Sequence, residues 1–171
     1  MVIATPSVGP REVMAALREV ADPEIPTVSV VDLGMIERVE VRPDGIEVEL
    51  LPTFVGCPAL EIIRDTIAGR LDEFGRPVDV QVSFATPWTS DRISSEGREK
   101  LRRSGFAPPP HLREGRALPM VGSTAAPETA VACPYCGSTT TTLENVFGPT
   151  QCRSIRHCSD CRQPFEAFKP I

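Results

Sequence analysis

Cys133-Pro134-Tyr135-Cys136-Gly137 and Cys158-Ser159-Asp160-Cys161 are two Cys-x-x-Cys pairs separated by a polar span. Each pair can bend into a tight knuckle that directs two thiolates at one point. Four thiolates around one ion form the closed tetrahedral site that zinc prefers. Pro134 favours the turn of the first knuckle, and Gly137 can adopt the left-handed conformation with which the chain leaves it. The spacing therefore predicts a metal ribbon over residues 131–171, with Cys133, Cys136, Cys158 and Cys161 as ligands.

The identity of the metal is less fixed than the site, because a four-sulfur tetrahedron also suits iron. His157 directly precedes Cys158, and adjacent residues rarely point into one tetrahedron, so we expect it behind the ligands or at the surface. Cys152, between the pairs, is interpreted as a thiol packed near the metal; the alternative is a partner for Cys57 chemistry. Phe165 and Phe168 are expected to form the apolar support beneath the knuckles.

Length and charge limit the classes of protein that fit. A chain of 171 residues has room for one ordinary domain and a small module. The formal net charge is −5, and residues 1–85 carry 7 Lys and Arg against 15 Asp and Glu. Such an acidic domain argues against nucleic-acid binding.

No targeting or membrane segment is visible in the sequence. The amino terminus lacks a basic start followed by an apolar run, and no apolar run approaches membrane-spanning length. Six cysteines could form disulfides, but these need an oxidising compartment. We therefore expect a cytoplasmic protein with reduced thiols and no membrane partner.

Residues 10–85 are predicted to form a compact domain of helices laid on one face of a small sheet. A first helix spans 10–21 and stops before Pro23. Strands at 36–42 and 46–50 flank the turn Pro43-Asp44-Gly45, so they should form an antiparallel hairpin. A helix over 58–74 carries an apolar stripe, and a third strand alternates over 78–84. The stripe consists of Leu60, Ile63, Ile67, Leu71 and Phe74.

The middle of the chain is less regular. Residues 94–103 show helical charge pairing, the run Phe106-Ala107-Pro108-Pro109-Pro110 forces extended backbone, and residues 111–132 have no period. The predicted fold class is α+β, an antiparallel-containing sheet with helices on one face followed by a zinc ribbon. The predicted domains are 1–108, a linker at 109–130, and the ribbon at 131–171.

Cys57 is the candidate reactive thiol. It lies between the end of a strand and a strong helix, and with Pro58 at the first helical position it should be the N-cap. There the helix dipole would favour the thiolate, Thr53 could supply a hydroxyl, and Gly56 would allow close approach of a ligand. The alternative is a buried structural cysteine.

The segment Asp22-Pro23-Glu24-Ile25-Pro26 is a stiff, extended turn that carries two carboxylates. Its simplest interpretation is a solvated loop. A role for Asp22 and Glu24 rests only on family resemblance.

Two groups of motifs resemble known families. Residues 22–26, 32–34 and 53–58 resemble the small domain of iron–sulfur assembly factors typified by SufT. Residues 88–94, 96–98, 100–101 and 105–109, followed by the four-cysteine ribbon, resemble the PaaD (PaaJ) family. Members of that family are accessory proteins encoded with the multicomponent phenylacetyl-CoA ring-epoxidising oxygenase. The resemblance covers the chain except its first residues and 112–130.

The resemblance implies a non-enzymatic maturation role in phenylacetate degradation. It implies that Cys57 holds or passes a transient iron–sulfur cluster, with Asp22 and Glu24 as its acidic turn. The implied partners are the epoxidase subunits, especially the iron–sulfur reductase. One thiol cannot hold a cluster alone, so a second protomer, Cys152 or a partner must add ligands. The alternative is an electron-carrying or scaffolding component, with iron in the ribbon and Cys57 structural.

Overall fold

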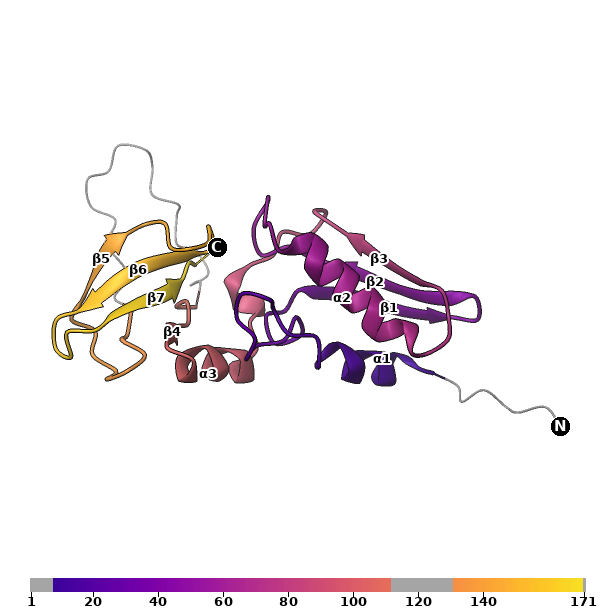
Figure 1. Ribbon diagram of the computed structural model, residues 1–171, viewed down its shortest axis with the longest axis horizontal. Helices are drawn as coiled ribbons and strands as arrows, with labels where there is room; N and C mark the ends of the chain where they lie inside the picture. Colours follow the sequence, from indigo (N-terminus) through magenta and orange to yellow (C-terminus); the bar gives the residue numbers. More distant parts are fainter. Residues whose placement is uncertain (1–7, 112–130, 171) are drawn as a thin grey trace. The chain divides into compact units, whose positions relative to one another are not determined.

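The computed structural model describes residues 8–111 and 131–170, which belong to two compact units, Met1–Trp88 and Thr89–Ile171 (Figure 1). In unit 1, β1 and β2 pair antiparallel, and β3 pairs parallel with β2, so the sheet order is β1-β2-β3. The crossover between the parallel strands is α2, and α1 packs on α2 and β1. The elements are α1 (Pro10–Leu17), β1 (Ile36–Arg42), β2 (Gly45–Leu50), α2 (Leu60–Asp72) and β3 (Val78–Val82).

Alternation in β2 decides which face of the sheet the helices cover. Ile46, Val48 and Leu50 are buried, whereas Glu47 and Glu49 point to the other face. There Glu47 and Glu49 pair with arginines of β1, at 2.7 Å and 3.3 Å. The helices contribute Val13, Ala16, Leu17, Ile63, Ile67 and Leu71 to the core. The predicted hairpin and the helix-covered face are therefore confirmed.

Both helices of unit 1 are shorter than predicted. α1 ends at Leu17 rather than near residue 21, and α2 runs from Leu60 to Asp72 rather than from 58 to 74. Accordingly Leu60 and Phe74, the ends of the predicted stripe, are only half-buried. In the described parts of the chain no helix is both long and apolar enough to cross a membrane.

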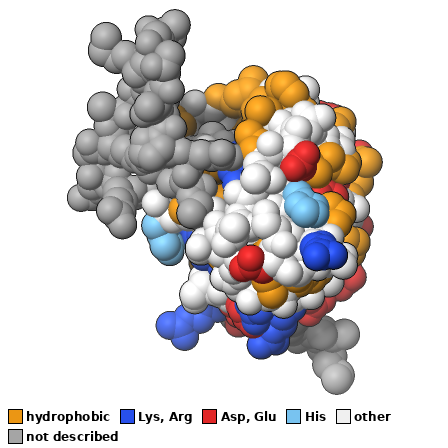
Figure 2. Space-filling view, turned by 90° about the vertical axis from the view of Figure 1, so that its left-hand side faces the viewer, with side chains coloured by type: hydrophobic (Ala, Val, Ile, Leu, Met, Phe, Trp, Pro, Cys, Tyr) orange, Lys and Arg blue, Asp and Glu red, His pale blue; other side chains and the backbone are white. Residues whose placement is uncertain are grey.

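Unit 2 combines the ribbon with the segment that precedes it. Its sheet has the order β4-β7-β6-β5, in which β4 pairs parallel with β7. The elements are the 3₁₀ turn η1 (Ser90–Arg92), α3 (Ser95–Arg103), β4 (Phe106–Ala107), β5 (Thr141–Asn145), β6 (Arg153–Cys158) and β7 (Pro164–Phe168). Ala107 of β4 is fully buried in a cluster with Cys133 and Phe165. On the face shown in Figure 2, hydrophobic side chains lie beside isolated charged groups.

The division between units differs from the predicted one. We expected the segment up to residue 108 to belong to the amino-terminal domain, but the residues after Trp88 belong to the unit of the ribbon. The cause is the pairing of β4 with β7, a contact between segments about 60 residues apart that no local pattern announces. Most of the predicted linker, residues 112–130, lies outside the described residues.

Arg98 fastens the segment ahead of the ribbon. Its guanidinium donates to the carbonyl oxygens of Ser90 (2.7 Å), Ile93 (3.3 Å) and Pro109. Burial lowers the pKa of Arg98, and the Asp91 carboxylate, 3.7 Å away, opposes this. The planar guanidinium can reach several carbonyls at once, which a lysine ammonium cannot do with the same geometry.

We expect Arg98→Lys to lower the free energy of unfolding of unit 2 by about 1–3 kcal/mol, because half-buried carbonyls lose a charged donor. Chemical denaturation followed by circular dichroism measures this. Arg102→Lys is the matched control, because Arg102 is exposed on the same helix and pairs only with Glu99 in the contacts described, at 2.8 Å. Equal stability of the two variants would contradict the role of Arg98.

Candidate thiol site and metal centre

One end of the sheet in unit 1 gathers the loops that carry the predicted thiol site. The pairing of Ile36 with Leu50 places the start of β1 beside the end of β2. The Leu51 N–H donates to the Met35 carbonyl at 2.7 Å, and the Ser83 N–H donates to the Leu50 carbonyl at 2.9 Å. The loop before β1, the loop after β2 and the segment after β3 therefore meet this end, opposite the β1–β2 turn (Figure 1).

Cys57 lies half-buried in a tight turn after β2. Its N–H donates to the Phe54 carbonyl at 3.2 Å, and its carbonyl accepts from the Leu60 N–H at 3.2 Å. Gly56, with φ of +97°, has open space where a side chain would stand. The chain can therefore make this turn only at a small energetic cost with glycine, and it leaves room next to the thiol.

The prediction that Cys57 is the N-cap of α2 is wrong by two residues. The N-cap is Ala59, because Pro58 and Ala59 form a separate turn ahead of the helix. The effect of a helix dipole falls off within the first turn, so it acts on Cys57 less than we expected. What distinguishes Cys57 is its half-buried position on a turn.

The surroundings of Cys57 are partly apolar. Thr53 is 7% exposed, so its hydroxyl belongs to the interior of the loop rather than to the surface. Three large hydrophobic side chains at this end of unit 1 are instead well exposed: Val55 (76%), Ile62 (57%) and Phe84 (59%). Exposed apolar groups near one end of a small unit are typical of protein contact surfaces.

Asp22 shapes the acidic turn. Its Oδ1 accepts from the backbone N–H groups of Glu24 (2.8 Å) and Ile25 (2.9 Å), and its own N–H donates to the Val28 carbonyl at 2.8 Å. This Asx-type turn replaces helical hydrogen bonds that the prolines prevent. The turn is thus an ordered loop held by its first carboxylate, and Glu24 beside it is half-buried.

We expect Asp22→Ala to lower the free energy of unfolding of unit 1 by about 1–2 kcal/mol, because two backbone donors lose their acceptor. Urea denaturation can be followed through Trp88, the only tryptophan, which is buried and donates from Nε1 to the Leu33 carbonyl at 2.9 Å. Asp65→Ala, at an exposed position on α2, is the control. A loss no greater than that of the control would show that the carboxylate is not needed for the turn.

Asp32 is a buried carboxylate at the same end that residue patterns alone did not single out. It is 3% exposed, and its Oδ2 accepts from the Ser29 N–H (3.1 Å) and hydroxyl (2.9 Å). The Asp32 N–H in turn donates to the Ser29 hydroxyl at 3.1 Å. The Ser-x-x-Asp spacing of this reciprocal pair was the signal that could have found it.

In unit 2 the four predicted ligands converge. The sulfur atoms of Cys133, Cys136, Cys158 and Cys161 all lie within 4.8 Å of one another. The Cys133–Cys161 and Cys136–Cys158 sulfur distances are both 3.6 Å. A zinc–sulfur bond of about 2.3 Å places the sulfurs of a regular tetrahedron about 3.8 Å apart. The quartet can therefore hold a metal ion of this kind.

Local backbone geometry forms both knuckles. Gly137, as predicted, adopts a left-handed conformation with φ of +77°, and its N–H donates to the Cys133 carbonyl at 2.9 Å. Arg162 takes the equivalent place after the second pair, with φ of +59°. A non-glycine residue with positive φ is uncommon, so the second knuckle carries modest strain.

The electrostatics of the quartet call for a cation. The N–H of Cys161 donates to the Cys158 sulfur and lowers the pKa of Cys158 to about 7, whereas burial raises the pKa of Cys161 to about 12. The four groups therefore cannot all be thiolates near neutral pH without a positive ion among them. A divalent cation would remove that obstacle by binding the sulfurs directly.

The remaining ribbon residues lie largely as expected. Cys152 is buried, and its sulfur lies 3.2 Å from the Thr150 hydroxyl rather than in the quartet. His157 is half-buried on β6 and is not part of the metal-binding group found among the described residues. Phe165 packs in the cluster that contains Cys133 and Cys158, and Phe168 is also buried.

Family comparisons agree with this division into a thiol-bearing domain and a metal ribbon. Residues 10–84 match the family described as iron–sulfur cluster assembly protein, and residues 118–169 match the PaaD zinc beta ribbon domain. The chain therefore joins a domain of the iron–sulfur assembly class to a zinc-ribbon module.

A full-length relative specifies the family. A protein of Escherichia coli (strain K12), whose name provisionally makes it a subunit of 1,2-phenylacetyl-CoA epoxidase, is 38% identical over 170 residues. The match covers 99% of this chain and 96% of that protein. The chain belongs to the PaaD family, the family of this epoxidase component.

Solved structures support the predicted α+β class. A domain of unknown function from Bacillus anthracis is 25% identical with a TM-score of 0.50, and the match covers 53% of this chain and 89% of that chain. A conserved hypothetical protein from Thermotoga maritima is 29% identical with a TM-score of 0.48, covering 55% and 94%. Together with the ribbon match, the first of these confirms the fold class.

Proposed function

We propose that this chain is a cytoplasmic accessory protein of phenylacetyl-CoA epoxidase that assists iron–sulfur cluster assembly or transfer through Cys57. It does not itself catalyse the oxygenation. The observation that carries the proposal is the half-buried Cys57, on an open turn, within the stretch that matches the iron–sulfur assembly family. Reduced thiols fit a cytoplasmic site of action.

The proposed chemistry is ligand exchange on iron. Cys57 loses its proton and binds iron of the cluster; on transfer, this iron–sulfur bond breaks as a cysteine thiolate of the client forms its own. Neither iron nor sulfur changes oxidation state, so no redox partner is needed. Because one thiolate is too few for a cluster, the remaining ligands come from the client or from a second copy of the chain.

The neighbouring residues have supporting roles in this proposal. Asp22 holds the acidic turn through two backbone N–H groups, and Glu24 provides a carboxylate for contact with iron or client. Thr53 is buried and supports the Cys57 loop from inside. The exposed Val55, Ile62 and Phe84 form an apolar contact surface for the client, for which we propose the iron–sulfur reductase of the epoxidase.

The four-cysteine ribbon has a structural role in this proposal, with zinc as its metal. Four sulfurs and no open ligand position suit structural zinc rather than catalysis. The ion, when bound, neutralises the thiolates and fixes the two knuckles. The chain's own residues then hold β4 and β7 against this core through Ala107 and Phe165.

Anaerobic reconstitution tests the proposal. Purified wild type and Cys57→Ala are loaded with iron and sulfide, repurified and mixed with apo-reductase, and cluster formation on the reductase is followed by absorption and activity. We expect transfer from wild type and from a Cys152→Ala control, which keeps Cys57. Efficient transfer from Cys57→Ala would overturn the role of this thiol.

A second candidate function is electron transfer through iron in the ribbon. The observation that favours it is the quartet itself, because 3.6 Å sulfur contacts suit iron as well as zinc, and Cys136 is exposed. Metal analysis with an absorption spectrum decides between the two. One colourless zinc per chain supports a structural ribbon, and a red rubredoxin-like spectrum supports the electron carrier.

A further inference from the structure

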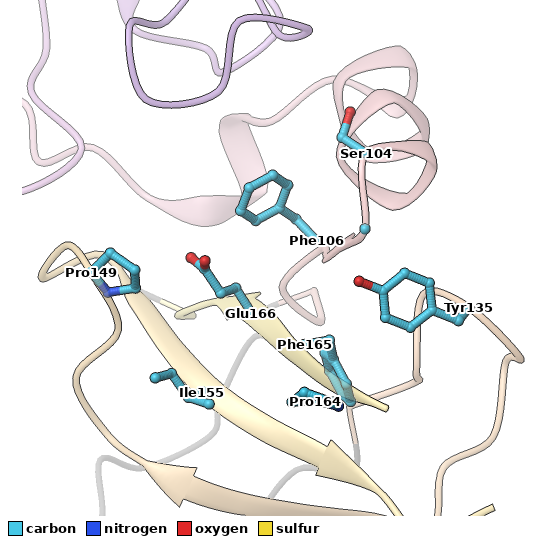
Figure 3. A pocket seen from close by; sticks show the side chains of 9 residues that line it. Ser104, Phe106, Tyr135, Pro149, Ile155, Pro164, Phe165 and Glu166 are labelled. Atoms are coloured by element: carbon cyan, nitrogen blue, oxygen red, sulfur yellow. The ribbon is translucent and has the colours of Figure 1, made fainter. Parts of the chain in front are cut away.

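A pocket of about 350 Å³ lies within unit 2, away from the metal quartet's own ligands. Figure 3 shows Phe106, Tyr135 and Phe165 around it, with Glu166 pointing between Pro149 and Phe106. Its volume is at the small end of the range of about 300–1,000 Å³ for ligand pockets, which gives room for one long side chain rather than a large cofactor.

Tyr135 forms one wall because the first knuckle and the end of α3 meet there. The residue stands between the ligands Cys133 and Cys136, and 58% of it is exposed. Gly105 has φ of +83°, and a side chain there would come within 2.9 Å of the Tyr135 hydroxyl oxygen. Glycine at this position thus lets the aromatic ring lie against the turn before β4.

Glu166 supplies the charge of the pocket. Of the described residues that line it, Glu166 alone carries a charge. One carboxylate oxygen, Oε2, is 2.9 Å from the Arg153 guanidinium, which is nearly buried and lies 5.3 Å from the centre of the Phe106 ring. The carboxylate is therefore held in place from behind by a buried cation while it lines the cavity.

We propose that this pocket binds an arginine side chain presented by an exposed segment of a partner protein. A neutral apolar group would bury the carboxylate without giving it a new donor, which is unfavourable. A guanidinium donates to the carboxylate and its plane stacks on aromatic rings, while its methylene stem covers apolar surface. The ribbon already shows this type of contact twice, with Arg153 over Phe106 and Lys169 over Phe147 at 4.6 Å.

The chain provides a single spectroscopic probe for the test, since Tyr135 is its only tyrosine. Full-length, zinc-loaded protein labelled with 3-fluorotyrosine should give one ¹⁹F signal from the pocket wall. The probes are acetylated, amidated Gly-Arg-Gly and its citrulline analogue, which has the same shape without the charge. We expect the arginine peptide to shift this signal saturably and to bind about tenfold tighter than the citrulline peptide.

Glu166→Gln should reduce this preference to within about twofold, while Glu144→Gln, at an exposed position on β5, should retain it. Because loss of Glu166 also removes a partner of Arg153, Tyr135→Leu is a second variant, followed by ¹H–¹⁵N spectra. It should weaken the arginine peptide about tenfold. Equal binding of both peptides, or unchanged binding in both variants, would overturn the proposal. Neither result bears on Cys57, which lies in the other unit.

Discussion

Cells that carry Cys57→Ala should lose phenylacetyl-CoA epoxidase activity to the level of cells without this protein, a fall of at least about tenfold. The cause is loss of the only thiol described in unit 1, not loss of fold. The side chain is half-buried, and the turn is held by backbone hydrogen bonds to Phe54 and Leu60 that alanine keeps. We therefore expect a change in the free energy of unfolding within about 1 kcal/mol.

Two measurements separate these effects. Epoxidase activity and the iron and sulfide content of the purified reductase report maturation, and urea denaturation followed by Trp88 fluorescence reports the stability of unit 1. Cys57→Ser is a useful second variant, because it retains a hydroxyl of nearly the same size but no thiolate. Cys152→Ala is the control for loss of a cysteine elsewhere. A fully active epoxidase with Cys57→Ala would exclude a role for this residue in cluster transfer.

Most of unit 1 could be predicted because its signals are local. Alternation in β2 indicates both the strand and its buried face, and Pro43-Asp44-Gly45 indicates the hairpin. The parallel pairing of β2 with β3 follows from the helix between them. By contrast, β4 has only two residues, and its pairing with β7 depends on tertiary contacts. This is why the unit boundary falls after Trp88 rather than at residue 108.

The site shows the same difference between local and tertiary signals. The quartet followed from spacing alone, because a Cys-x-x-Cys pair brings its own two sulfurs together. Cys57 was placed two residues too close to α2, because proline after a cap signals either a helix or a turn that precedes one. The burial of Asp32 against Ser29 depends on how the loop before β1 folds onto unit 1, which a sequence pattern does not reveal.

Removal of the ribbon metal should unfold the sheet of unit 2 and leave unit 1 folded. Structural zinc contributes about 10–16 kcal/mol of apparent binding free energy in small peptides, which is comparable to the whole stability of a domain. Two of the ligands, Cys133 and Cys158, also belong to the buried cluster that contains Ala107 of β4. Loss of the metal should therefore free the pairing of β4 with β7 as well as the two knuckles.

Limited proteolysis with and without a strong chelator, and of Cys133→Ser, measures this effect. We expect rapid cleavage within residues 131–170 in both cases, with release of zinc, while a fragment containing unit 1 persists and Trp88 fluorescence is unchanged. Cys152→Ser is the matched control, because Cys152 lies in the same ribbon but outside the quartet. If Cys133→Ser kept the protease resistance of wild type, the ribbon would be stable through its apolar core alone. The metal would then need a role other than folding, such as electron transfer.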